Sequence, residues 1–207
     1  MKYIAIATLS VLLGASSRSD SLGPHEVTLE TADGIQIHGW YIHPGSHEVV
    51  EEEDNAFPRE PFIIECDING ESFVLINNHL KCCGDGAIDS IDTNDDEARR
   101  QSASLLLETF IQDNYSESNV IVVGDLNDDI HEPRPSNVFW NFIENSEQFK
   151  FVDMQLALNG ENEQHWSYWS YPSWPSHLDH ILITNELFDE LDNADVLTIK
   201  VDEYLED

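Results

Sequence analysis

Runs of apolar residues separated by polar turns predict a set of β-strands with one long helix among them. An uninterrupted β-branched run at residues 120–123 is typical of a strand buried on both faces. Two earlier apolar-rich runs, residues 61–66 and 73–80, are joined across Asn69-Gly70 and predict a β-hairpin. A further strand is expected at residues 181–183.

A helix is expected over residues 95–112, between the hairpin and the β-branched run. Its first turn is acidic, which suits the positive end of a helix, and Arg99 and Arg100 are expected to be solvated. A helix followed by a buried strand is the pattern of layered α/β proteins. The predicted apolar stripe of this helix consists of Ala98, Leu105, Leu106 and Phe110.

The chain begins with a separate pattern. Residues 25–43 alternate in polarity on either side of Asp33-Gly34, which predicts an N-terminal β-hairpin. This piece resembles the opening hairpin of many α/β-hydrolases, but no Gly-x-Ser-x-Gly nucleophile turn follows it. Residues 44–55, with an acidic run at 51–54, are expected to form a solvated linker.

Polar residues stand where the predicted strands end. Asp125 and Asn127 follow the β-branched run, and side chains two apart on a strand share a face. The carboxylate could hold a metal or accept a proton from water, and the amide could donate to a phosphoryl oxygen. On the strand at residues 73–80, Asn77 and His79 share a face, with Lys81 next along the chain. The alternative is an ordinary polar turn at each strand end.

A third polar group precedes the last strand. In a regular strand Asp179 would share a face with His177, and His180 would point to the opposite face. A buried aspartate at this position needs a histidine, a metal or backbone amides as partner. An aromatic loop lies just before it and could either face a substrate or cover the core edge. Its members are Trp166, Tyr168, Trp169, Tyr171 and Trp174.

Composition narrows the function. The chain has 207 residues, 41% of them hydrophobic, which predicts a folded globular protein. With 41 acidic against 9 basic residues, the formal net charge is -32, which disfavours non-specific binding to nucleic acid or anionic membranes. An enzyme that cleaves polyanions would therefore need a divalent metal or a local basic patch in its cleft.

The first residues have the pattern of a secretory signal peptide. Lys2, an apolar run to Gly14 and small residues at 15–17 predict a signal peptide over residues 1–17, and hence a secreted or periplasmic protein. No other stretch reaches the roughly 20 apolar residues of a membrane span. Export would permit a disulfide, but three cysteines cannot all pair within the chain. They are Cys66, Cys82 and Cys83.

Three stretches together resemble the endonuclease/exonuclease/phosphatase superfamily of metal-dependent phosphodiesterases and phosphatases. They are Phe-Val-Leu-Ile-Asn-Asn-His-Leu-Lys-Cys-Cys-Gly, Val-Ile-Val-Val-Gly-Asp-Leu-Asn-Asp and Tyr-Pro-Ser-Trp-Pro-Ser-His-Leu-Asp-His-Ile-Leu. The resemblance covers about residues 57–204. It implies an α/β fold, part of a four-layered sandwich of two mixed sheets with outer helices. It also implies Mg²⁺, or another divalent cation such as Mn²⁺ or Ca²⁺, as cofactor.

The resemblance also implies roles for particular residues. His79 matches the histidine that contacts the scissile phosphate, and Asp125 the aspartate that acts as base or metal ligand. Asn127 matches the asparagine that steadies the phosphoryl oxygen, and Asp179 the aspartate that orients the last catalytic histidine. The substrate-binding candidates are Arg59, Asn77 and Lys81. A wider phosphate cradle could consist of Arg59, Lys81, Arg99, Arg100 and Arg134.

The sequence also departs from the family pattern. The region before residue 57 is too short for the family's first half with its metal-binding glutamate, and no Ser-Asp-His motif follows the last strand. We therefore expect three segments: a signal peptide (1–17), a hairpin with acidic linker (18–56), and a partial catalytic domain truncated at both ends (57–207).

The expected function is a secreted, divalent-metal-dependent phosphoric ester hydrolase, with weak or absent activity in this chain because part of the metal site is missing. Its substrate could be a small phosphate ester, a phospholipid headgroup or nucleic acid, and no obligate protein partner is evident. The main alternative is a non-catalytic remnant or interaction module of the same fold. An α/β-hydrolase fragment is a third reading.

Overall fold

The structure is a computed structural model. It describes residues 25–30, 36–42, 55–68, 70–171, 173 and 175–198. The predicted signal peptide, the acidic run at 51–54 and Trp174 lie outside the described residues. For the first two strands the account is limited to the backbone.

Seven strands form one mixed sheet, with the spatial order β1-β2-β3-β4-β5-β7-β6. Among the described strands, the single parallel pair is β4 with β5, and every other neighbouring pair is antiparallel. The strands are β1 (His25–Glu30), β2 (Gln36–Ile42), β3 (Phe62–Ile68), β4 (Glu71–His79), β5 (Asn119–Asp125), β6 (Phe149–Phe151) and β7 (Asp179–Thr184). The four α-helices in the described part of the chain are α1 (Asp96–Asn114), α2 (Trp140–Glu144), α3 (Met154–Glu163) and α4 (Phe188–Leu191).

Both predicted hairpins are confirmed. β1 pairs with β2, and β3 pairs with β4, in each case antiparallel. β2 also pairs with β3, so the N-terminal hairpin extends the same sheet. Strands and helices thus combine into the expected α/β fold. The second sheet of a four-layered sandwich stays a prediction, because the described residues form one sheet.

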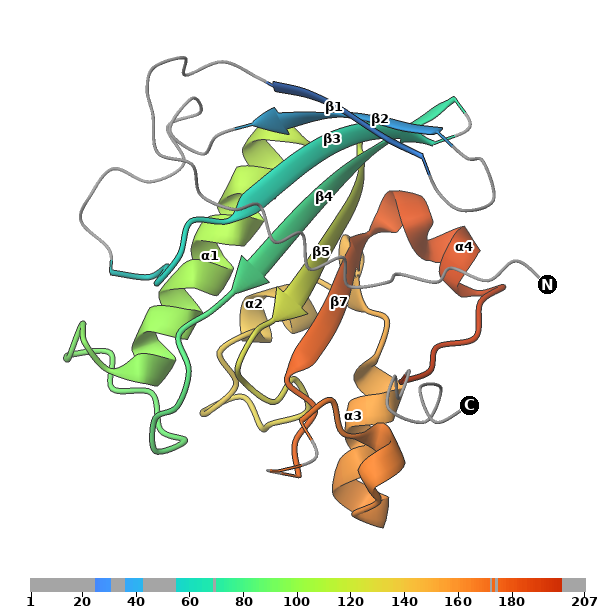
Figure 1. Ribbon diagram of the computed structural model, residues 1–207. Coiled ribbons are helices and arrows are strands. Elements are labelled where there is room, and N and C mark those ends of the chain that lie inside the picture. Colours follow the sequence, from blue (N-terminus) through green and yellow to red (C-terminus); the bar gives the residue numbers. More distant parts are fainter. Residues whose placement is uncertain are drawn as a thin grey trace.

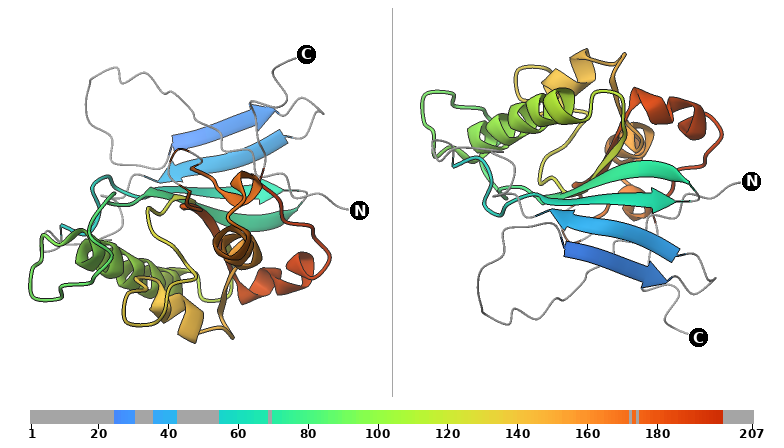
Figure 2. Two further views of the ribbon diagram at one scale, coloured as in Figure 1. Left: turned by 90° about the horizontal axis from the view of Figure 1, so that it is seen from below. Right: turned by 90° about the horizontal axis from the view of Figure 1, so that it is seen from above.

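Helix α1 begins where the sequence predicts. The side chain of Asp95, just before its first residue, accepts a hydrogen bond from the backbone N–H of Ala98 at 2.7 Å. Figures 1 and 2 show α1 and α2 on one face of the sheet, with α1 running along β4 and β5. As the crossover between these parallel strands, α1 fixes where their ends meet.

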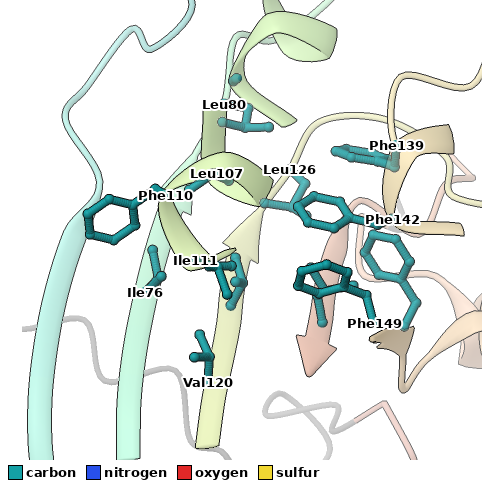
Figure 3. Close-up of a cluster of buried hydrophobic side chains, with 14 of the residues drawn as sticks. Ile76, Leu80, Leu107, Phe110, Ile111, Val120, Leu126, Phe139, Phe142 and Phe149 are labelled. Atoms are coloured by element: carbon teal, nitrogen blue, oxygen red, sulfur yellow. The ribbon is translucent and has the colours of Figure 1, made fainter. Parts of the chain in front are cut away.

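The core lies between this helical layer and the sheet. Figure 3 shows apolar side chains from β4, β5 and α1 meeting phenylalanine rings from the segment after β5. Phe142 packs edge-on against Phe149 with ring centroids 5.0 Å apart. The labelled core residues are Ile76, Leu80, Leu107, Phe110, Ile111, Val120, Leu126, Phe139, Phe142 and Phe149.

Two expectations for α1 are wrong. Leu105 was expected on the apolar stripe but is 49% exposed, whereas Ser104 is buried and donates to Asn141 on α2 at 2.7 Å. Arg100 was expected in solvent but is only 2% exposed, because it makes ion pairs inside the fold. The buried face of the helix is therefore partly polar, and apolar periodicity alone misplaces it.

No helix in the described part of the chain combines the length and the apolar character needed to cross a bilayer.

Candidate active site

Three of the predicted site residues meet where β4, β5 and β7 lie side by side. In the sheet register His79 is the partner of Asp125, and Asp125 is the partner of Asp179. β4 and β5 end at His79 and Asp125, whereas the antiparallel β7 begins at Asp179. A histidine and two carboxylates therefore stand in a row at one rim of the sheet.

The row is partly open to solvent, and its charged groups lie close enough to affect one another. His79 Nε2 lies 3.9 Å from Asp125 Oδ2, and their side chains are 48% and 35% exposed. Partial burial raises the pKa of Asp125, the charge of Asp179 raises it further, and His79 opposes both effects. A positive charge placed between the two aspartates would relieve this repulsion.

Gly124 allows the strand ends to come this close. Its φ of +132° is one that residues with a side chain rarely adopt. A Cβ built there would lie 1.9 Å from the backbone oxygen of Asn78 and 2.8 Å from the side-chain oxygen of Asn77. The glycine is thus required for β5 to approach β4 just before Asp125.

Asn127 is placed differently from the prediction. β5 ends at Asp125, and Asn127 has a left-handed backbone with φ of +55°, so the rule that alternate residues share a face no longer applies. Its side-chain amide donates to the backbone oxygen of Leu80 at 3.1 Å, and its backbone N–H donates to Asp125 Oδ1 at 3.1 Å. Asn127 therefore ties the loop after β5 to the loop after β4 and orients the Asp125 carboxylate.

The candidate substrate-binding residues are only partly gathered at the row. Asn77 is exposed two positions before His79 on the same strand, while Lys81 makes a 3.0 Å ion pair with Asp96 of α1. Arg59 is exposed before β3. Of the wider cradle, Arg100 is buried in contact with Asp128, and the remaining residues contact other partners. Arg99 donates to the backbone oxygen of Asn55, and Arg134 pairs with Glu144.

A second polar group, not predicted from the sequence, lies buried between β7 and α3. Asp153 Oδ2 contacts His177 Nε2 at 2.9 Å and His180 Nδ1 at 2.7 Å. Its other oxygen accepts the backbone N–H of Ile181. His180 Nε2 lies 2.8 Å from the backbone oxygen of Asp128, an atom that can only accept, so this nitrogen must carry a proton.

The carboxylate and the histidines of this group stabilise each other's charged forms. Burial acts to lower the pKa of His180, but the ion pair with Asp153 and the hydrogen bonds outweigh it, so the pKa is raised. Burial likewise acts to raise the pKa of Asp153, but the contacts with both histidines bring it below its ordinary value. The group is therefore a buried imidazolium–carboxylate pair with His177 as a second donor.

The same group corrects the prediction for the last strand. Asp179, which was expected to be buried, is exposed, and the buried aspartate that has histidine partners is Asp153. His180 does point away from the face of Asp179, as predicted. No spacing signal identifies Asp153, because it reaches His177 and His180 from another part of the chain.

The atoms in this group are spaced for hydrogen bonds rather than for metal binding. Asp153, His177 and His180 offer three ligand atoms close together. Their contacts of 2.7 and 2.9 Å are shorter than the roughly 3.3 Å between neighbouring ligands around a tetrahedral zinc ion. Asp125 and Asp179, on paired positions at the rim of the sheet, offer the carboxylate oxygens that hard divalent cations prefer.

The role of the aromatic loop stays a prediction. Trp166 and Tyr171 are 44% and 52% exposed. A Cβ at Gly160 would lie 3.3 Å from the ring of Trp169, so this ring packs against α3. The loop thus has both exposed and packed members.

No family model matches the sequence, and no curated protein is significantly similar to it. Several solved structures are similar. The catalytic domain of human Nocturnin with a bound sulfate anion has 17% identity and a TM-score of 0.41, and the match covers 79% of this chain and 47% of that chain. An endonuclease/exonuclease/phosphatase from Bacteroides vulgatus has 13% identity and a TM-score of 0.40, covering 72% of this chain and 53% of the other.

A mannosyl-6-phosphatase from Bacteroides thetaiotaomicron has 15% identity and a TM-score of 0.36, covering 80% of this chain and 53% of the other. Of these three, the Bacteroides vulgatus protein carries the name of the superfamily that the three sequence stretches resemble. The chain spans about half the length of each of the three.

Proposed function

We propose that this chain is a divalent-metal-dependent phosphoric ester hydrolase whose reaction takes place at the row formed by His79, Asp125 and Asp179. The observation that carries the proposal is the register of β4, β5 and β7, which brings these three side chains together at an open rim of the sheet. The same residues belong to the three sequence stretches that resemble the superfamily.

The residues present fit a divalent cation. Two carboxylates stand on paired positions, and the raised pKa of Asp125 reflects burial together with the charge of Asp179. A bound cation would supply the charge that polarises the phosphoryl oxygen and lowers the pKa of bound water. Asp125 and Asp179 would hold the cation, and its positive charge would offset the repulsion between the two carboxylates.

The other side chains would position the substrate. His79 can donate a hydrogen bond from Nε2 to a phosphoryl oxygen when this nitrogen carries a proton, and Asn77 offers an exposed amide nearby on the same strand. Asn127 acts indirectly, because its backbone N–H holds Asp125 Oδ1. With two carboxylates as the metal ligands, we expect slow turnover.

Hydrolysis of two model substrates tests the proposal. Purified protein is assayed on bis-p-nitrophenyl phosphate, a diester, and p-nitrophenyl phosphate, a monoester, with Mg²⁺ or Mn²⁺ and after addition of EDTA. We expect turnover that EDTA abolishes, and a loss of at least about 100-fold in Asp125→Asn. Asp113→Asn, which makes the same change at an exposed position on α1, should keep full activity.

The outcomes separate the hydrolase from the alternative. A folded wild-type protein without metal-dependent turnover would support a non-catalytic remnant or interaction module. Equal activity in Asp125→Asn and wild type would place any hydrolysis outside the proposed row. If the wild type shows turnover that EDTA abolishes, the ratio of its rates on the diester and the monoester indicates which class of phosphate ester it prefers.

We also propose that the protein is exported, on the basis of the apolar run and small residues at 1–17. Sequencing the N-terminus of protein secreted by a bacterial host should give a start close to Arg18. A start at Met1 in protein from the cytoplasm would contradict export.

A further inference from the structure

The loop between β4 and α1 gathers three carboxylates at the start of α1, and none of them belongs to the proposed catalytic row. Asp85 lies in the loop, Asp95 caps the helix, and Glu97 is in its first turn. Each offers an oxygen atom, and the three atoms all lie within 4.8 Å of one another. We refer to these three residues as the loop carboxylates.

Glu97 is the unusual member of this group. It is only 2% exposed, and its Oε1 accepts the backbone N–H of Gly86 at 2.6 Å, but its buried Oε2 has no hydrogen-bond partner. A Cβ at Gly84 would lie 2.1 Å from Glu97 Oε1, so the loop closes directly over the carboxylate. A buried carboxylate oxygen without a donor is unfavourable, and a cation would satisfy it.

Basic side chains do not neutralise the group. Arg100 Nη2 is 3.5 Å from Glu97 Oε1, but its Nε donates to Asp128 at 2.7 Å, so one guanidinium serves two buried carboxylates. Among the described residues, no ion pair joins Asp85 or Asp95 to a basic side chain. The three carboxylates therefore lie close together, and the one basic side chain in the described part of the chain that contacts them, Arg100, is shared with Asp128.

We propose that the loop carboxylates bind one Ca²⁺ ion. Calcium takes six to eight oxygen ligands at about 2.3–2.6 Å, so ligands on opposite sides of the ion are about 4.6–5.2 Å apart. Oxygen atoms within 4.8 Å of one another fit this sphere. Water and backbone oxygens would complete the coordination.

The bound ion would stabilise the loop beside the catalytic row. Arg100 Nη1 donates to the backbone oxygens of Lys81 and Cys83, both at 2.8 Å. Arg100 thus connects Glu97 to the segment that follows His79. This site does not depend on the proposed hydrolase function, because none of its ligands belongs to the catalytic row.

Calcium titration of matched variants tests the site. All variants carry Asp125→Asn, so that the catalytic row is impaired as a metal site, and all are freed of divalent ions with EDTA before use. Asp85→Asn removes one ligand charge, while its side-chain oxygen can still accept the N–H of Ala87. The control is Asp89→Asn, an identical change at an exposed loop aspartate outside the group, whose oxygen accepts the N–H of Ile91.

Isothermal titration calorimetry and thermal unfolding provide the readouts. We expect one Ca²⁺ per chain and a rise in Tm of about 5–10 °C at a hundredfold excess over the dissociation constant. Asp85→Asn should weaken binding at least tenfold, and Asp89→Asn should not. Three results would overturn the proposal: no saturable Ca²⁺ binding, equal affinity in the two variants, or the same rise in Tm from NaCl at equal ionic strength.

Discussion

At the scale of single residues, Asp125 shows why the proposed site is destabilising for the fold. Burial and the neighbouring Asp179 raise its pKa, so folding disfavours the ionised form that a metal would need. Stability from this group is complete below its ordinary pKa of 3.8 and is lost as the pH rises through the higher folded-state pKa. At neutral pH the ionised carboxylate therefore opposes folding.

Asp125→Asn should consequently stabilise the protein at pH 7 while it lowers hydrolysis at least about 100-fold. We expect a gain of up to about 1 kcal/mol in the free energy of unfolding, a small value because the side chain is 35% exposed. Urea denaturation in metal-free buffer at several pH values measures this gain, which should shrink as the pH is lowered. A variant less stable than wild type at pH 7 would show that Asp125 supports the fold instead.

His180 should have the opposite effect on the pH dependence of stability. Its pKa is raised in the folded chain, so its contribution is present below the ordinary pKa of 6.5 and is lost as the pH rises through the folded-state pKa. We expect the free energy of unfolding to fall as the pH rises above 6.5. In urea denaturation across pH, His180→Gln should lose this slope, whereas the exposed His165→Gln should keep it.

At the scale of elements, local sequence specifies the strands and the helix start but not the buried face of α1. The strand at 120–123 and the acidic first turn of α1 depend on neighbours in sequence, and both are found as predicted. The burial of Arg100 depends on Asp128, and that of Ser104 on Asn141. Each partner is more than 25 residues away and belongs to another segment, so no local pattern contains it.

Arg100→Ala should destabilise the protein strongly because it leaves buried carboxylates without a counter-charge. Burial raises the pKa of Asp128, and the charge and hydrogen bond of Arg100 are the main effects that oppose it. We expect a loss of about 3–5 kcal/mol, whereas Arg134→Ala, at an exposed pair with Glu144, should cost less than about 1 kcal/mol. Urea denaturation of both variants measures the difference. Similar losses would mean that the buried contacts of Arg100 are not stabilising.

At the scale of the whole molecule, the residues of the proposed site come from segments far apart in the sequence, and this limits how much of the site can be predicted from sequence alone. His79, Asp125 and Asp179 could be predicted because each belongs to a recognisable stretch at a strand end. The register that aligns these three residues depends on how the strands pair. The contact of the Asn127 side chain with the loop after β4 depends on the left-handed backbone of Asn127. Asp153 had no such signal, since its role arises from packing against β7.

The net charge of -32 should make stability depend strongly on salt. Repulsion among surface carboxylates opposes the compact state, and salt screens it over a Debye length of about 10 Å at 0.1 M and about 3 Å at 1 M. We expect the Tm of metal-free protein to rise between 10 mM and 1 M NaCl. Differential scanning calorimetry measures the rise, and an unchanged Tm would indicate that the charges are already balanced locally.

The position of β5 also has a consequence for the order of folding. Its neighbour β4 precedes it by a single helix, whereas its other neighbour β7 follows only after α2, β6 and α3. Contacts between segments close in sequence form with a smaller loss of chain entropy, so we expect β3, β4, α1 and β5 to assemble before β7 docks. His79 and Asp125 would then meet first, and the like charge of Asp179 would arrive in the last step, where it slows the completion of the sheet.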